Sequence, residues 1–277
     1  MKQLVCYLTH KIDDFVLDQY RKLKTALNSD EYDVVMIFNS FKMSAEEIEL
    51  PSEIDHFHIQ DCEQLTTYKQ QGFKFFMDFN SPKFLKPDMH KFFSGTYALF
   101  SYLDSIDYSE YDFVYYMEFD VYYNGNIKEM FDDFATNLKD YDMLTSKIRT
   151  YFQSTNWWWF DNNVDADIRT NREWDIPLEE WKRSVNPLTR FSTKAIDLLF
   201  KHYKTGPVKF FEFFWITVIS FNGLKYGDFG GTGDYVIKGY ENKYYRNISY
   251  VTAPQIRFRQ IREKNKLYHP VKEYDKC

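Results

Sequence analysis

Two carboxylates, Glu118 and Asp120, are separated by a single residue where an apolar stretch gives way to a glycine turn. The five residues before them read FVYYM, which is typical of a strand buried inside a sheet. An acidic pair is costly to bury unless a cation lies beside it. Ligands of open α/β sheets bind beyond the carboxyl ends of strands, which is where this pair falls. The spacing therefore predicts a metal site; acids at a strand edge that merely face solvent remain the alternative.

The kind of ion follows from the oxygen donors. A hard divalent cation such as Mn²⁺ or Mg²⁺ prefers oxygen ligands and leaves positions for water and substrate phosphates. Asp120 is the strongest ligand candidate, and Glu118 is either a second ligand or a partner through water. A substrate with a diphosphate would complete the shell, and the metal would neutralise charge on a departing diphosphate.

A third carboxylate, Glu212, is embedded in the aromatic run FEFFWIT of residues 211–217. An apolar setting raises the pKa of a carboxylate toward the range that suits a general base. The alternative is a residue that points outward while its neighbours pack inward. The residue types alone leave both interpretations of Glu212 open.

The elements that must position these acids alternate between strand and helix. Apolar runs predict strands at residues 4–8, 32–38, 54–59 and 113–117, and apolar stripes predict helices at 16–27 and 94–106. Such alternation predicts an α/β fold with a sheet that is mostly parallel and flanked by helices.

The second half of the chain is less regular. We expect a helix over 127–138, a strand over 142–147, a helix from residue 193 and another apolar run at 210–219. An irregular polar region begins at the three tryptophans of 157–159, and residues 226–235 are rich in glycine. There is no internal repeat and no linker, so residues 1–277 are expected to form a single domain with functional halves at 1–126 and 127–277.

Composition excludes some classes of protein. With 277 residues and a formal net charge of −6, the chain lacks the basic balance of a dedicated nucleic-acid binder. Aromatic residues make up 20% of it, which permits stacking on sugars and equally permits a large core. The three cysteines lack metal or redox spacing, and neither a signal peptide nor a long apolar span is evident, so we expect a cytoplasmic protein.

The motif and its setting resemble the GT-A fold glycosyltransferases, whose mark is an acidic D-x-D motif at the end of a strand. Here the motif reads Glu118-Phe119-Asp120, entered through YDFVYYM and left through VYYNGNI. Its first position departs from the usual Asp. The resemblance implies a GT-A-like, Rossmann-like sheet and a metal that binds the diphosphate of a nucleotide-sugar, with a loop-rich acceptor half.

The resemblance also implies where the donor binds. The ends of the first strands hold the base and ribose, which assigns Thr9, His10 and Asn39 to the donor. Further phosphate or sugar contacts are expected from three basic residues: Lys86, Lys91 and Arg149. In the glycine-rich loop, Asp228 and Asp234 are candidates for binding acceptor hydroxyls.

The C-terminal sequence YHPVK is similar to members of this fold that bring a late His onto the metal and a nearby Lys onto the diphosphate. These positions are His269 and Lys272. Neutral imidazole suits Mn²⁺, and an ammonium group suits phosphate oxygens. Several inverting members also have a Glu before an aromatic and Thr-containing segment, which implies that Glu212 deprotonates the acceptor hydroxyl.

The sequence therefore predicts a metal-dependent, inverting glycosyltransferase with a UDP- or GDP-sugar donor, bound by residues 1–126. Its expected acceptor is a glycan or lipid-linked glycan of the bacterial surface, bound by residues 127–277. The basic segment 257–266 allows contact with phosphates or with an anionic membrane surface, and so peripheral association with the inner face of the membrane; a solvated charged face is the alternative. A metal-dependent nucleotidyltransferase or phosphohydrolase and a non-catalytic carbohydrate-binding protein remain as alternatives, and a retaining mechanism remains if Glu212 is structural.

Overall fold

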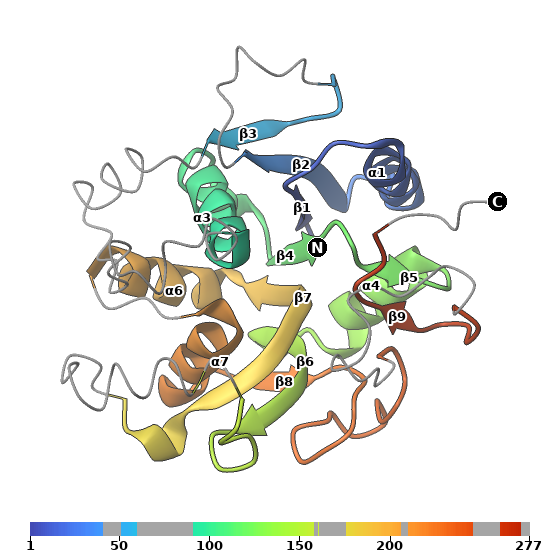
Figure 1. Cartoon of the computed structure of the whole chain (residues 1–277). Coiled ribbons are helices and arrows are strands. Elements are labelled where there is room, and N and C mark those ends of the chain that lie inside the picture. The colour runs from blue at the N-terminus through green and yellow to red at the C-terminus, as the bar shows by residue number, and fades with distance from the viewer. Residues whose placement is uncertain are drawn as a thin grey trace.

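The computed structural model describes residues 1–40, 51–59, 91–157, 160, 176–205, 210–245 and 261–272. A seven-stranded sheet runs through these residues in the order β3-β2-β1-β4-β7-β6-β8, and a separate pair of short strands, β5 and β9, lies beside it (Figure 1). Lys86, Trp158 and Trp159 lie outside the described residues.

The strands of the large sheet are β1 (Gln3–Thr9), β2 (Tyr32–Ser40), β3 (His56–Ile59), β4 (Phe113–Glu118), β6 (Met143–Thr150), β7 (Lys182–Ser192) and β8 (Tyr226–Asp228). The short pair is β5 (Tyr122–Tyr123) and β9 (Leu267–Tyr268). The α-helices are α1 (Asp14–Ala26), α3 (Lys91–Asp104), α4 (Ile127–Asn137), α6 (Thr193–Thr205) and α7 (Phe211–Phe221).

The sheet is mixed and mostly parallel. β1 pairs in parallel with both β2 and β4, β2 pairs in parallel with β3, and β6 with β8. Only β7 breaks the pattern among the described strands, since it runs antiparallel to β4 and to β6. The predicted class of fold, a mostly parallel α/β sheet flanked by helices, is confirmed.

Both faces of the sheet are covered by helices. Every residue of β1 is buried, as the uninterrupted apolar run predicts. Alternate side chains serve two cores: Cys6 packs with residues of α3, α6 and α7, whereas Val5 and Tyr7 pack with residues of α1 and α4. The helices accordingly appear on opposite sides of the strands in Figure 1.

Local signals account for the first helices. The side chain of Asp13 accepts a hydrogen bond from the N–H of Val16 at 2.9 Å and so caps α1, whose buried stripe includes Tyr20 and Leu23. Asn126 caps α4 in the same way. The apolar run at 210–219 forms α7, and this helix is buried on nearly all sides between β7 and α6. No helix among the described residues has the length and apolarity to span a membrane.

Candidate active site

Three ligand-type side chains from distant parts of the chain meet at the carboxyl end of β4. The ligand atoms of Glu118, Asp120 and His269 all lie within 4.8 Å of one another. Nε2 of His269 is 3.1 Å from a carboxylate oxygen of Glu118 and 3.2 Å from one of Asp120. Two carboxylates and an imidazole form a donor set that suits Mn²⁺, so the residues present fit the predicted ion.

The two acids owe their position to the pairing of β4 with β1. Leu8 of β1 is the register partner of Glu118, and the N–H of Phe119 donates to the carbonyl of Leu8 at 2.9 Å. The chain then turns, with the N–H of Val121 donating to the carbonyl of Glu118 at 3.1 Å. Asp120 is buried in this turn, just past the end of the strand.

His269 is held by contacts on both sides of it in the sequence. Before it, Tyr268 of β9 pairs with Tyr122 of β5 in an antiparallel register. After it, the N–H of Val271 donates to the carbonyl of Asp120 at 2.7 Å. These backbone contacts place the imidazole beside the acidic pair.

The imidazole and the two carboxylates of the triad shift one another's pKa. Desolvation lowers the pKa of His269, but Asp120 and Glu118 together raise it to about 10. Burial tends to raise the pKa of Asp120, yet its pKa is lowered because the charges of His269, Lys272 and His10 outweigh burial. The imidazole is thus protonated at neutral pH in the metal-free protein, and a divalent ion must displace that proton.

Both carboxylate oxygens of Glu118 contact neighbouring side chains. The hydroxyl of the buried Tyr116 donates to Oε1 at 3.0 Å, while Oε2 faces His269. Hydrogen bonds of this kind hold a ligand carboxylate in place. The Glu at the first position of the motif therefore lies within the cluster, beside Asp120.

Glu212 lies in the first turn of α7 and is half-buried. Burial is the main cause that raises its pKa to about 8; the negative charge of Glu118 adds to this, whereas His269 and Arg183 oppose it. These influences mean that Glu212 lies within electrostatic range of the triad. The side-chain amide of Asn186 donates to the carbonyl of Phe211 at 3.2 Å and anchors this turn to β7.

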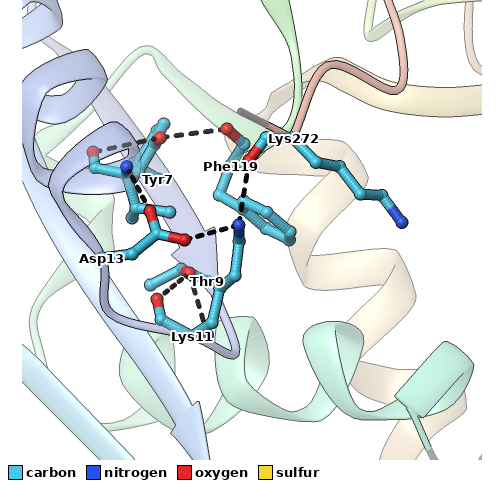
Figure 2. A network of polar contacts seen from close by, with 7 residues as sticks. Tyr7, Thr9, Lys11, Asp13, Phe119 and Lys272 are labelled. Atoms are coloured by element: carbon cyan, nitrogen blue, oxygen red, sulfur yellow. Dashed lines mark hydrogen bonds and ion pairs between the residues drawn. The ribbon is translucent and has the colours of Figure 1, made fainter. Parts of the chain in front are cut away.

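The loop after β1 is a compact polar network (Figure 2). The hydroxyl of Thr9 donates to the carbonyl of Lys11 at 2.6 Å and accepts from its N–H at 3.2 Å, so it closes the turn locally. The ammonium of Lys11 bonds to Asp13 at 2.6 Å and to the carbonyl of Lys272 at 3.0 Å, which ties the C-terminal segment to this loop.

His10, which belongs to this loop, and Lys272 lie within electrostatic range of Asp120. The exposed ring of His10 meets Phe119 edge-on, with ring centroids 4.9 Å apart. Desolvation lowers the pKa of His10, and the charge of Lys272 lowers it further, while Asp120 opposes both. In Figure 2 the side chain of Lys272 points away from the Lys11 network. The charge of Lys272 lowers the pKa of Asp120 as well as that of His10.

Two other residues predicted to bind the donor, Asn39 and Lys91, lie on elements other than β1 and β4. Asn39 is buried near the end of β2, and its Oδ1 accepts no hydrogen bond within the described part of the chain. Lys91 begins α3. A buried acceptor without a partner among the described residues, such as Oδ1 of Asn39, suits a hydrogen-bond donor on a ligand.

Two predicted acceptor-binding acids have local partners. The buried carboxylate of Asp228 accepts from the N–H groups of Gly230 at 3.0 Å, Gly231 at 2.7 Å and Lys147 at 2.8 Å, so it shapes the glycine-rich loop. Asp234 accepts from the side chain of Gln153 at 2.8 Å.

Several residues of this region were not singled out from the sequence: Tyr116, Lys147, Arg183 and Asn186. Tyr116 belongs to an apolar run, and no sequence pattern indicates that its hydroxyl donates to Glu118. Lys147 and Arg183 lie on neighbouring strands of uneven register, and the alignment that brings them together is tertiary.

No protein-family model matches the chain, and no curated protein matches its sequence. Among solved structures, the chain is similar to mouse xyloside xylosyltransferase 1 in its apo form, with 14% identity and a TM-score of 0.40 over 92% of this chain and 87% of that one. It is also similar to the mannosyltransferase Ktr4p from S. cerevisiae, with 12% identity and a TM-score of 0.38 over 82% and 68% of the two chains. A third is the galactosyltransferase LgtC in complex with donor and acceptor sugar analogs, with 12% identity and a TM-score of 0.33 over 81% and 73%. Since all three TM-scores are below 0.5, these similarities carry no argument about function.

Proposed function

We propose that this protein is a metal-dependent glycosyltransferase of GT-A type that moves a sugar from a nucleoside-diphosphate donor to a hydroxyl acceptor. The observation that carries the proposal is the triad of Glu118, Asp120 and His269 at the carboxyl end of a central strand. A mostly parallel sheet binds its ligands at this edge. The positive charge of Lys272 beside the triad supports a diphosphate there.

Each residue of the site has a role in donor binding. Glu118, Asp120 and His269 would hold Mn²⁺ or Mg²⁺, which when bound neutralises negative charge on the diphosphate. The ammonium of Lys272 would bind phosphate oxygens. The base and ribose would lie along the ends of β1 and β2, where His10 and Asn39 stand and where Thr9 closes the turn.

We assign Glu212 as the group that takes the proton of the acceptor hydroxyl, with inversion at the anomeric carbon. A general base must be deprotonated, and the pKa of about 8 in the metal-free protein leaves most of this carboxylate protonated at pH 7. A divalent ion at the triad adds positive charge nearby and lowers that pKa. Donor binding would thereby prepare the base.

The wider setting of the reaction is part of the same proposal. Residues 1–126 would bind the nucleotide-sugar, and residues 127–277, which include the C-terminal tail, would bind the acceptor. The acceptor would be a glycan or lipid-linked glycan of a bacterial surface, with the enzyme in the cytoplasm and at the inner face of the membrane.

A thermal-shift titration with UDP and GDP, each with and without Mn²⁺, tests the assignment. We expect stabilisation that needs both nucleotide and metal, and we expect Asp120→Asn to abolish it. The control is Asp140→Asn, an exposed acid outside the site, which should behave as wild type. A protein indifferent to every combination would sink the proposal.

Turnover then separates the alternatives. Nucleotide-sugars are screened for Mn²⁺-dependent release of UDP or GDP, with the configuration of the product determined by NMR. A phosphohydrolase would instead release inorganic phosphate from the nucleotide, and a carbohydrate-binding protein would bind sugar without turnover. Retention of anomeric configuration would overturn the inverting mechanism and leave the class of enzyme intact.

A further inference from the structure

The first turn of α7, which carries Glu212, is held by polar contacts from strand β7. The side-chain amide of Asn186 donates to the carbonyl of Phe211 at 3.2 Å, and the hydroxyl of Ser184 contacts the carbonyl of Glu212 at 3.2 Å. These two carbonyls belong to the peptide groups on either side of the Cα atom of Glu212. Because peptide groups are planar, contacts to both of them restrict the direction in which this side chain leaves the backbone.

Asn186 is the centre of a buried polar network. Its Oδ1 accepts from the hydroxyl of Ser184 at 2.6 Å and from the hydroxyl of Thr145, on β6, at 2.7 Å. All three residues are fully buried. The two hydroxyls occupy the acceptor side of the amide and leave its donor side for the helix. A buried network of paired polar groups rigidifies the structure around it.

A bulge in β7 aims this amide at the helix. Leu144 of β6 pairs with Arg190 of β7. The next pair joins Ser146 to Val185, so β7 has additional residues in between, and Pro187 is one of them. Proline gives no N–H to a ladder and is typical of bulges inside sheets. Bulges beside functional sites redirect side chains.

The same helix packs against the strand that carries the acidic pair. The ring centroid of Tyr116, on β4, lies 5.2 Å from that of Trp215 and 6.0 Å from that of Phe211. The hydroxyl of this tyrosine donates to Glu118 at 3.0 Å. Ring packing therefore ties α7 to the strand of the triad, and the network ties its first turn to β7.

The N-cap of α7 does not hold this turn in place. Phe210 occupies the N-cap and makes no capping hydrogen bond through its side chain. Burial raises the pKa of Glu212 to about 8, and a hydrogen bond from the main chain of Asn186 is among the influences that oppose the rise. Strand β7 therefore contacts the carboxylate of Glu212 as well as its peptide groups.

We propose that Asn186 is a positioning residue that holds Glu212 toward the triad. The inference rests on the proposed function, which makes Glu212 the base. A base must lie within hydrogen-bond reach of the proton that it takes, and a displacement of about 1 Å costs about 100-fold in rate. Asn186 acts through Glu212 and takes no proton itself.

Turnover of variants tests this role, with the nucleotide-sugar that the screen selects. Asn186→Ala removes the centre of the network, and Thr145→Val removes one hydroxyl with little change of shape. Each should lower kcat about tenfold or more, while KM for the nucleotide-sugar stays within about twofold of wild type. Thr145→Ser keeps the hydroxyl and should keep kcat within about twofold. If Asn186→Ala does not fold, the Thr145 pair still decides.

Thr217→Val is the matched structural control. Thr217 lies on the same helix, and its hydroxyl exchanges hydrogen bonds with the main chain of Lys182 on β7 at 2.9 and 3.0 Å. Its loss should destabilise the protein in urea, as Thr145→Val does, and leave kcat unchanged. An equal fall of kcat in this control would show that any loosening of α7 on β7 slows the reaction, and would overturn a specific role for Asn186.

The carboxylate gives a readout that needs no donor. In metal-free protein with ¹³C-labelled glutamate, the NMR signal that is missing from Glu212→Gln belongs to Glu212, and its titration midpoint is measured. In Asn186→Ala and Thr145→Val the midpoint should differ from wild type by about half a pH unit or more, because the released carboxylate changes its surroundings. Thr145→Ser and Thr217→Val should match wild type.

The outcomes separate this inference from the proposed function. Transfer with a normal kcat in both Asn186→Ala and Thr145→Val overturns the positioning role and leaves the glycosyltransferase assignment intact. A midpoint unchanged in both variants overturns it as well, since the carboxylate then keeps its surroundings without the network. If no nucleotide-sugar is turned over but the midpoint still moves with the network, the network holds Glu212 and the glycosyltransferase assignment falls.

Discussion

Binding of a divalent metal should release a proton from His269. The pKa of this imidazole is about 10 in the metal-free protein, because two carboxylates face it at 3.1 and 3.2 Å. One pKa unit corresponds to about 1.4 kcal/mol, so deprotonation at pH 7 costs ~4 kcal/mol. We therefore expect the apparent affinity for Mn²⁺ at pH 7 to be about a thousandfold lower than the affinity of a site in which His269 is already deprotonated. The apparent affinity should rise about tenfold per pH unit between pH 6 and 8.

The assay is titration calorimetry with Mn²⁺ in buffers of different ionisation enthalpy, which counts the protons released. Wild type should release about one proton from His269 on binding, in addition to the fraction that Glu212 releases as the ion lowers its pKa. His269→Gln should bind more weakly and lose this proton release, whereas His202→Gln, which changes a histidine on α6, should retain it. A wild-type affinity that is flat across this pH range, with no proton released, would refute the reasoning.

The same pKa makes a prediction about stability without metal. His269 has a folded pKa raised above its ordinary value, so its contribution is fully present below about pH 6.5 and is lost as pH rises toward 10. Two pH units within this window correspond to ~3 kcal/mol. We expect the melting temperature of the metal-free protein to fall from pH 7 to 9, and to fall less in His269→Gln. If the melting temperatures of wild type and His269→Gln depended equally on pH, the ionisation of His269 would not contribute to stability as reasoned here.

Three further predictions concern single side chains. Glu212→Gln should leave binding of nucleotide and Mn²⁺ intact and slow transfer at least about 100-fold, measured by product formation; normal turnover would refute the base assignment. Tyr116→Phe removes the hydrogen bond to Glu118 and should weaken Mn²⁺ about tenfold by calorimetry, whereas unchanged affinity would show that the hydroxyl does not orient the ligand. Arg190→Met orphans carbonyls at the end of α4, to which the buried guanidinium donates at 2.6 Å, and should cost roughly 3 kcal/mol or more in urea unfolding; a loss below about 1 kcal/mol would contradict this role.

The strands and helices of the first half were predictable because their signals are local. The run at the start of the chain is apolar throughout, and the strand β1 that it forms is buried on both faces. The stripe through Val16, Tyr20 and Leu23 forms the buried face of α1. These patterns depend on the chain's own periodicity and on burial in a parallel sheet.

Strand β7 is the longest of the strands that were not predicted from the sequence. Its sequence KRSVNPLTRFS is polar and contains Pro187, which argues against a central strand. The structure nevertheless buries most of it between β4 and β6, where Asn186 bonds to Thr145 at 2.7 Å and Arg190 bonds to helix-end carbonyls. Burial of these polar groups is tolerated only because tertiary partners satisfy them, and those partners are distant in the sequence.

The sequence by itself predicted a cation beside the acidic pair, because an apolar strand that ends in Glu118 and Asp120 brings two carboxylates to a position where burial is costly without one. Only the tertiary structure brings His269 beside this pair, because the pairing of β9 with β5 places it there. The structure likewise decided that Arg183 stands opposite Arg149, since that register depends on a bulge. Local sequence patterns indicate which charged side chains are buried and need a partner. Pairing between strands that are distant in the sequence determines which side chains lie beside them.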